Sequence, residues 1–301
     1  MKTSFQLSKR HARSRIKFEK VFPYILVLPF LLLFILFFVV PLLSAARTSL
    51  FFDPLIGDER FVGLDQYIRA VNDVDLQKGL MNVFLFGLIF MVVLVLLATT
   101  AALILDAKAS RFHRLAVFVP YAIPSAVAAL MWGYLYSNQF GPMADIGDLF
   151  GFSPPDLLAR DTVLFSLVNL VVWQFLGYNM LILYVALSSI SRELFEAARV
   201  DGASPWQIAW MIKLPLLRPA LGLVVFFSCI GSLQIFNEPE VLSAIAPDVI
   251  NTAYTPNLFA YTVAFTNREL SYSAAISILI GGLAILFAVA FALFGRRRTN
   301  D

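Results

Sequence analysis

ELFEAARVDGASPWQIAWMIKLPLLRP, residues 193–219, lies between two long apolar runs. Its first half carries the signals of a short helix. Ser191 can cap the start of this helix, and Glu193 and Glu196 lie near the positive end of the helix dipole. Gly202 is a favoured left-handed terminator, so we expect the helix to stop there.

The second half of the stretch predicts another short helix. Ser204 and Pro205 fit its N-cap and first position. We expect it to end at Leu214, because Pro215 disfavours helical geometry in the residue before it. Small residues around the bend would let another surface approach closely, namely Ala197, Ala198, Gly202 and Ala203. The stretch therefore predicts two short helices joined by a tight bend.

Apolar runs on both sides of this stretch dominate the 301-residue chain. Hydrophobic residues make up 59% of the sequence and charged residues only 14%, too few for the polar surface of a soluble domain. A helical run of about 20 residues crosses the hydrocarbon core of a bilayer. Six runs are long enough: roughly 21–46, 80–105, 115–137, 163–188, 216–236 and 272–295. The sequence predicts an all-α integral membrane protein with six transmembrane helices.

Basic residues are unevenly distributed between the connections, which predicts the orientation of the spans. One side would carry Lys2, Lys9, Arg10, Arg13, Arg15, Lys17, Lys20, Lys108, Arg111, Arg114, Arg192, Arg199, Lys213, Arg218, Arg296, Arg297 and Arg298. The other side would carry Arg47, Arg60, Arg69, Lys78, Arg160 and Arg268. Both termini are therefore expected in the cytoplasm. The basic tails would contact anionic lipid headgroups and not nucleic acid.

The sequence contains no energy source of its own. A phosphate-binding Gly-x-x-x-x-Gly-Lys-Ser/Thr loop is missing, and the expected spans lack the ionisable groups on which ion-coupled carriers depend. His11 and His113 stand alone, without the spacing of a metal site. The sequence also lacks a clustered Asp/His or Ser/His set that a membrane enzyme would need. We expect a transport subunit, not an enzyme, without metal or cofactor in this chain and with energy supplied by a partner.

The residues around the bend resemble a known family, the permeases of binding-protein-dependent ABC importers. Glu196-Ala197-Ala198, Gly202 and Ile212-Lys213-Leu214-Pro215 match the EAA loop of that family without a gap in spacing, and Asp201, Trp206 and Pro219 also fit. The resemblance implies a type I ABC importer permease, whose loop (192–218 here) is the coupling element that docks on an ATPase. The docking residues would be Glu196, Ala197, Ala198, Asp201, Gly202, Ala203 and Trp206.

Other stretches resemble the carbohydrate-uptake branch of that family, in particular the first permease subunit of maltose- and trehalose-type importers. The matching residues are 61–67 (FVGLDQY), Pro120, Pro124, Trp132, Gly141 and 232–238 (SLQIFNE). The Gly-Gly-Pro that normally follows is replaced by Ala244-Ile245-Ala246-Pro247. The outer loop and its docking protein are therefore expected to depart from the family pattern.

The resemblance implies partners and a location. A separate solute-binding protein would deliver a mono- or oligosaccharide to a heterodimer of this chain and a second homologous permease. Two copies of the ATPase would bind Mg-ATP. The complex would lie in the plasma membrane of a bacterium or archaeon. We divide the chain into a basic cytoplasmic tail (1–20), a transmembrane permease domain (21–295) and a cytoplasmic tail (296–301).

Polar and amphipathic side chains in the fourth and fifth runs are candidates for the solute pathway, because such groups in spans tend to face a pathway or the bundle interior. They are Asn169, Trp173, Tyr178, Asn179, Ser232, Gln234 and Asn237. In related sugar permeases the solute contacts come from these regions. Trp173 and Tyr178 could stack on a sugar ring. The alternative is that these groups bond between helices as packing contacts, at about 1 kcal/mol each.

Two other functions stay open at this point. An importer of the same family could carry glycerol phosphate or another polyol, but few basic residues lie near the expected pathway. An ion-driven secondary carrier would work without an ATPase, but it would need intramembrane charge. A neutral sugar is therefore the preferred prediction.

Overall fold

The structure, a computed structural model, describes residues 22–53, 58–108, 111–138 and 141–297. Over these residues the chain is helical for most of its length, and two short strands form one hairpin. The tail predicted at 1–20 lies outside the described residues, as does the end of the tail predicted at 296–301.

Within the described part of the chain, 4 helices are long and apolar enough to cross a membrane. They are Phe22–Thr48, which includes η1 (Ile35–Val39) and α2 (Val40–Thr48), then α4 (Val74–Lys108), α8 (Val163–Ser188) and α15 (Leu270–Arg297). Each covers one of the predicted apolar runs, so the first, second, fourth and sixth runs are confirmed as long helices.

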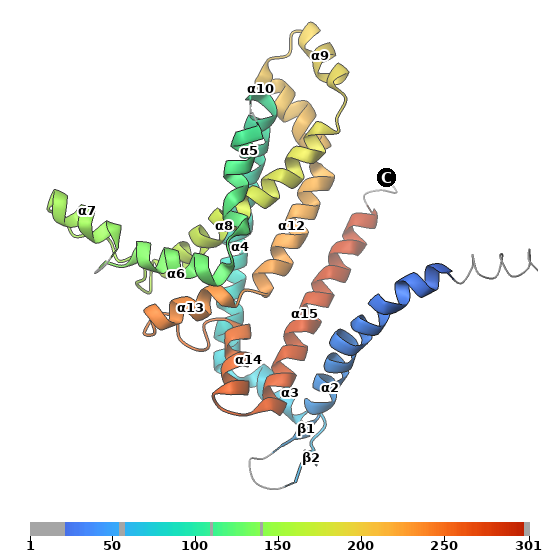
Figure 1. Ribbon diagram of the computed structural model, residues 1–301, viewed down its shortest axis with the longest axis vertical. Coiled ribbons are helices and arrows are strands. Elements are labelled where there is room, and N and C mark those ends of the chain that lie inside the picture. Colours follow the sequence, from blue (N-terminus) through green and yellow to red (C-terminus); the bar gives the residue numbers. More distant parts are fainter. Residues whose placement is uncertain (1–21, 54–57, 109–110, 139–140, 298–301) are drawn as a thin grey trace, which may run out of the picture.

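The third predicted run is sharply bent. α5 (Arg111–Phe118) and η2 (Val119–Ala122) precede α6 (Ser125–Tyr136), and the two halves meet at 98°. The break has a local cause, because Pro124 excludes helical geometry at Ile123, which has φ −81° and ψ 128°. α6 therefore leaves the bundle sideways (Figure 1).

A second bend lies at the start of the fifth predicted run, 216–236. The helix Pro205–Leu216 comprises α10 (Pro205–Gln207), η3 (Ile208–Lys213) and α11 (Leu214–Leu216), and it meets α12 (Arg218–Leu233) at 64°. The prediction that helical structure ends at Leu214 is wrong, because the helix continues past Pro215. η3 is a π-helical turn in which the Leu214 amide reaches back to the Ala209 carbonyl. This wider turn relieves the clash between a proline ring and the preceding turn.

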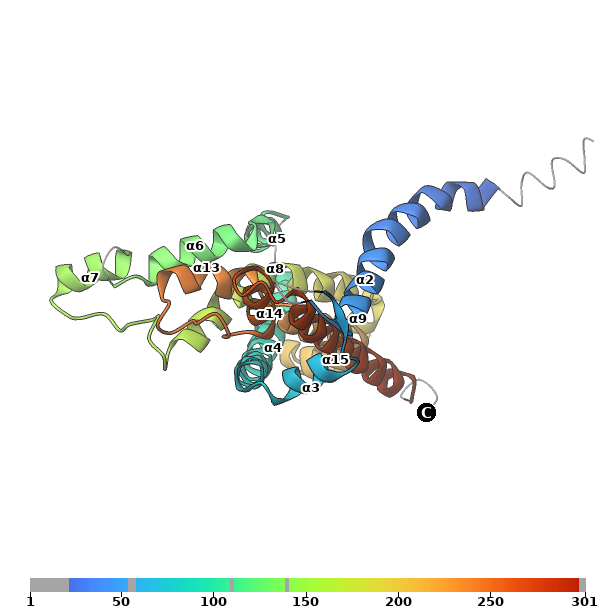
Figure 2. The same cartoon turned by 90° about the horizontal axis from the view of Figure 1, so that it is seen from below.

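Short elements gather at the two ends of the bundle (Figure 1). α9 (Arg192–Val200) and α10 form one tip. The opposite end holds β1 (Phe51–Phe52), its antiparallel partner β2 (Arg60–Phe61), α3 (Asp65–Asn72) and α14 (Pro256–Phe265). α7 (Pro142–Phe150) and α13 (Asn237–Ile245) lie to one side with α6, as Figure 2 shows from below.

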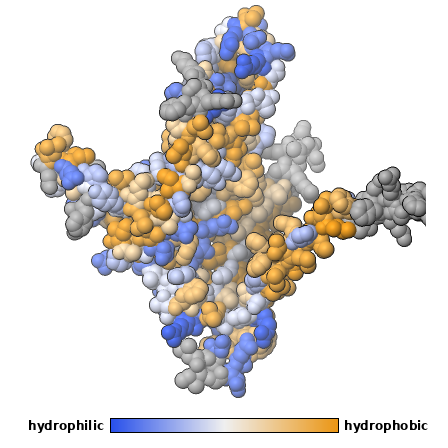
Figure 3. Space-filling model, viewed as in Figure 1, coloured by the Kyte–Doolittle hydropathy of each residue, from blue (hydrophilic) through white to orange (hydrophobic). Residues whose placement is uncertain are grey.

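α4 is the central helix, and it packs on both α8 and α12. Phe86, Phe90 and Leu94 of α4 are buried with Leu167 and Leu170 of α8 in the largest apolar cluster. The first helix differs, because its side chains up to residue 38 are exposed and its C-terminal part α2 packs against α15. It leans away from the bundle in Figures 1 and 2, and its surface is strongly apolar in Figure 3.

α8 approaches the α5–η2 segment closely at Gly177. A Cβ at this position would overlap the carbonyl oxygen of Val117 and lie 2.7 Å from Cα of Phe118. Because the obstacle is backbone, Gly177→Ala should push the segment away, at an overpacking cost of about 1–3 kcal/mol. We expect a lower unfolding temperature for the purified protein in detergent.

Gly282 in α15 is the matched control for this substitution, since a Cβ there meets nothing within 4 Å. Gly282→Ala should leave the unfolding temperature unchanged or raise it, because alanine favours helix over glycine by about 1 kcal/mol. Equal unfolding temperatures for the two variants would contradict the close approach at Gly177.

Candidate functional site

The predicted helical hairpin forms one tip of the molecule. α9 ends in a left-handed residue, Gly202, with φ +84°. The Gly202 amide donates to the Arg199 carbonyl, and the Ala203 amide donates to the Ala198 carbonyl. This pair of bonds is a Schellman motif, which satisfies the last carbonyls of the helix. The predicted termination at Gly202 is confirmed.

Ser204 caps the second helix of the hairpin as predicted. Its side chain accepts a hydrogen bond from the Gln207 amide, and the Gln207 side chain accepts one from the Ser204 amide. This reciprocal capping box fixes the angle at which the second helix starts. Ser191 occupies the N-cap position of α9, but its side chain makes no capping bond.

The candidate coupling residues share the surface of this tip. Glu196, Ala197, Asp201, Gly202 and Trp206 are exposed, and Ala198 and Ala203 are half-buried. Large apolar side chains accompany them: Val200 is 88% exposed, Met211 72% and Trp206 71%. A soluble tip rarely presents such side chains together, so this surface has the composition of a protein contact.

Three elements meet beneath the tip at Lys213. Its ammonium group forms an ion pair with the Asp106 carboxylate at the end of α4. The same ammonium group lies over the ring of Phe195, 5.0 Å from its centroid. The two ionic side chains are only 15% and 22% exposed. The ion pair thus connects α9, η3 and α4 at one partly buried point.

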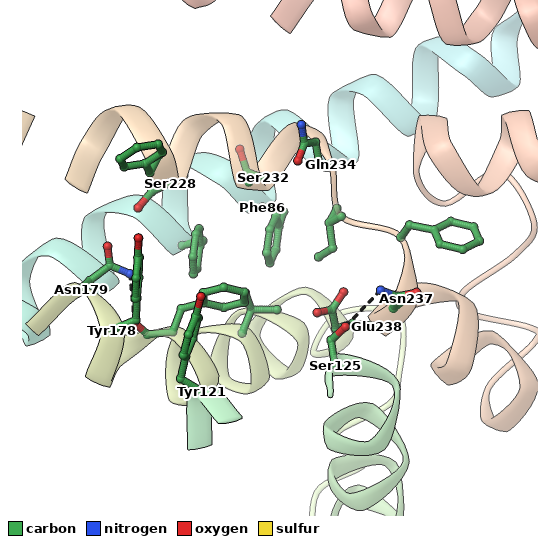
Figure 4. A pocket seen from close by; sticks show the side chains of 17 residues that line it. Phe86, Tyr121, Ser125, Tyr178, Asn179, Ser228, Ser232, Gln234, Asn237 and Glu238 are labelled. Atoms are coloured by element: carbon green, nitrogen blue, oxygen red, sulfur yellow. Dashed lines mark hydrogen bonds between the residues drawn. The ribbon is translucent and has the colours of Figure 1, made fainter. Parts of the chain in front are cut away.

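The second candidate site is a cavity of about 350 Å³ in the bundle (Figure 4). Its lining comes from α4, η2, α6, α8, α12 and the start of α13. The lining residues are Phe86, Phe90, Tyr121, Ser125, Val171, Phe175, Tyr178, Asn179, Phe227, Ser228, Gly231, Ser232, Gln234, Ile235, Phe236, Asn237 and Glu238. The volume falls in the range of small-molecule sites, roughly 300–1,000 Å³.

Aromatic rings form one wall of the cavity. Tyr121 and Tyr178 are stacked, with centroids 4.7 Å apart and ring planes at 15°. Phe175 meets Tyr121 edge-on at 5.8 Å. Figure 4 shows the two tyrosines beside each other, below Ser228 and Ser232 of α12. A wall of flat rings with hydroxyl groups at the rim suits a ligand that has both apolar faces and polar edges.

Two residues of the cavity lining carry polar atoms without partners. Among the described residues, Asn179 Oδ1 and Ser228 Oγ are buried and have no hydrogen-bond partner. The amide nitrogen of Asn179 is already used, since it donates to the Phe175 carbonyl at 2.9 Å. Buried polar atoms of this kind are normally satisfied, so a ligand or water is expected to bond to them.

The far end of the cavity carries a carboxyl group. Asn237 Nδ2 donates to Ser125 Oγ at 3.1 Å and so joins the start of α13 to the start of α6. Glu238 follows it and is only 6% exposed. Burial raises the pKa of the Glu238 carboxyl, whereas a hydrogen bond from its own backbone amide favours the charged form.

The structure brings together five of the seven predicted pathway residues, Tyr178, Asn179, Ser232, Gln234 and Asn237. Asn169 and Trp173 lie outside this cavity. Asn169 donates to the Tyr136 hydroxyl at 2.8 Å, and Trp173 packs edge-on against Trp132 at 5.6 Å. These contacts are of the packing type that was the alternative interpretation for the pathway residues.

Three residues of the cavity lining were not predicted as pathway residues: Tyr121, Ser125 and Glu238. The proline pair Pro120 and Pro124 could have indicated the first two, because broken helices line cavities in transporters. Among the described residues, no cluster of His, Cys, Asp or Glu could hold a metal ion.

Known proteins resemble this chain along most of its length. A trehalose/maltose transport system permease of Thermococcus litoralis is 28% identical over 95% of this chain and 98% of its own. An sn-glycerol-3-phosphate transport system permease of Escherichia coli O157:H7 is 32% identical over 89% and 91%. An arabinooligosaccharides transport system permease of Bacillus subtilis is 30% identical over 87% and 84%.

The fold also matches solved structures and a family model. A chain of a bacterial alginate ABC transporter, solved with a periplasmic protein that binds an alginate pentasaccharide, superposes with a TM-score of 0.82. It is 19% identical, and the match covers 94% of this chain and 97% of that one. Residues 95–300 match the model of the binding-protein-dependent transport system inner membrane component. This chain therefore belongs to the family of binding-protein-dependent inner membrane permeases of ABC transporters.

Proposed function

We propose that this chain is the transmembrane permease subunit of an ATP-driven importer for a mono- or oligosaccharide. The cavity carries the proposal, because its stacked tyrosines suit the apolar faces of a sugar ring and its unpartnered polar atoms suit sugar hydroxyls. Relatives named for trehalose, maltose and arabinooligosaccharides support the same solute class.

Within this proposal, Tyr178, Asn179, Ser232, Gln234 and Asn237 contact the solute as it passes through the cavity. Asn169 and Trp173 instead join α8 to α6, through their contacts with Tyr136 and Trp132.

The hairpin is the proposed contact with the ATPase, through Glu196, Ala197, Ala198, Asp201, Gly202, Ala203 and Trp206. Closure of two ATPase copies around Mg-ATP would move this tip. α12 continues the hairpin and lines the cavity, so the movement would reach the solute site. A second homologous permease completes the bundle, and an extracytoplasmic binding protein delivers the sugar.

The proposed topology has six spans, of which the bent α5–α6 pair forms the third and α12, which follows the hairpin, forms the fifth. Both termini lie on the cytoplasmic side of a bacterial or archaeal plasma membrane. The tip with α9 shares that side, because basic connections favour the cytoplasm. The chain then consists of the tail 1–20, the permease domain 21–295 and the tail 296–301.

A second candidate solute is glycerol phosphate, because a relative that is 32% identical is named for it. That solute is an anion, whereas the lining of this cavity includes a carboxyl group. The two candidates can be separated by uptake into proteoliposomes that contain the complete importer. We expect ATP-dependent uptake of a sugar in the presence of the binding protein, and none of glycerol phosphate.

Tyr178→Ala should lower sugar uptake about tenfold, because it removes one ring of the stacked pair and leaves Tyr121 without its stacking partner. Basal ATP hydrolysis should stay unchanged, since the hairpin is untouched. Tyr134, which is 54% exposed and outside the cavity, is the matched control. Tyr134→Ala should transport normally, and an equal loss in both variants would contradict the assigned site.

A further inference from the structure

One carboxyl group faces the cavity, and its lining provides no positive charge to balance it. Among the described residues that line the cavity, Glu238 is the only acid, and none is Lys, Arg or His. Figure 4 shows its carboxyl group beside Ser125 and Asn237, turned toward the space between the aromatic wall and α12. A buried carboxyl group is usually paired with a cation, so this arrangement calls for an explanation.

Burial raises the pKa of the Glu238 carboxyl, and a hydrogen bond from its own backbone amide opposes that shift. Glu238 is the second residue of α13, which starts at Asn237. The unpaired amides and dipole of a helix N-terminus stabilise a negative charge in its first turn. The side-chain amide of the neighbouring Asn237 donates to Ser125 Oγ.

We propose that Glu238 is a specificity residue that admits neutral, hydroxylated solutes to the cavity and rejects anionic ones. A carboxylate accepts hydrogen bonds from sugar hydroxyls, and it repels a second negative charge. At about 6 Å and an effective dielectric constant of roughly 20–40, this repulsion lowers the affinity for a singly charged anion about tenfold to a hundredfold.

The inference rests on the proposed function, because it assumes that the cavity is the solute site. It goes further by predicting that this importer rejects acidic solutes of the kind for which two similar proteins are named, glycerol phosphate and alginate. Selection would then occur twice, in the binding protein and again in the membrane, with Glu238 as the second filter.

The test uses the complete importer in lipid nanodiscs at pH 7, without the binding protein. The probes are glucose and glucuronate, which share one ring and differ only in the carboxylate at C6. Binding is measured by saturation-transfer NMR, which detects weak ligands. We expect the wild-type importer to bind glucose at least about tenfold more tightly than glucuronate. Glu238→Gln should reduce this ratio to about twofold, with little change in glucose affinity.

Glu240 provides the matched control, because it lies in the same first turn of α13 but outside the cavity lining. Glu240→Gln should keep the wild-type ratio. An unchanged ratio in Glu238→Gln overturns the inference, and so does a wild-type importer that binds neither probe or binds both equally. The proposed function is judged separately, by ATP-dependent sugar uptake with the binding protein present, and it fails only if that uptake is absent.

Discussion

Gly202→Asp is expected to abolish ATP-driven uptake while the protein still folds and inserts into the membrane. Gly202 has φ +84°, and a Cβ at this position meets nothing within 4 Å. The backbone strain for aspartate is about 1–2 kcal/mol, too little to unfold the chain. Its carboxylate would, however, project from the tip into the proposed contact with the ATPase. A charge buried there without a partner would weaken docking strongly.

Two measurements check this expectation, co-purification of the ATPase with the permease and uptake into proteoliposomes. Gly151 is the matched control, because it also has a left-handed φ, +69°, and open space around its Cβ, but it ends α7. Gly151→Asp introduces the same strain and the same charge away from the hairpin, so it should retain the ATPase and transport. Normal uptake by a well-expressed Gly202→Asp variant would contradict the coupling assignment.

The hairpin was predictable because its signals are local. Gly202 and the Ser204–Pro205 pair act on residues within one turn of themselves, and the structure confirms both. The prediction that the helix ends before Pro215 is wrong for a physical reason. The rule that helix ends before proline assumes an α-helical turn, and the π-helical turn Ile208–Lys213 sets different hydrogen-bond spacing ahead of it.

The cavity was only partly predictable, because its walls come from helices that are distant in the sequence. Polar side chains within apolar runs indicated Tyr178 and Ser232, which line the cavity. The same criterion indicated Asn169, which does not line it. Which polar residue faces inward depends on how α8 is rotated against α4 and α6, and the sequence of one helix does not determine that. Tyr121 reaches the cavity because the helical axis turns by 98° after Ala122. A hydropathy pattern does not predict the angle of such a turn.

Lys213→Met should uncouple ATP hydrolysis from uptake, lowering the solute transported per ATP about tenfold. The substitution removes the ammonium group, and with it both the ion pair with Asp106 and the charge above the Phe195 ring. The pair connects the hairpin to α4, which supplies Phe86 and Phe90 to the cavity. Removing one charge also leaves the other partly buried and unpaired, which destabilises this junction. Basal ATP hydrolysis should persist, because no residue of the proposed ATPase contact changes.

The charge exchange Lys213→Glu with Asp106→Lys separates coupling from packing. Each single reversal places like charges together and should transport less than Lys213→Met, whereas the double variant restores an opposite pair and should recover much of the coupling ratio. Lys78 and Asp75 form the matched control, since this ion pair is 68% and 57% exposed at the start of α4. Lys78→Met should have no measurable effect, because exposed pairs contribute about 0–1 kcal/mol. If the double reversal transports no better than the single ones, the ion pair does not transmit the movement, and the junction must act through the Phe195 contact and the buried Leu217 instead.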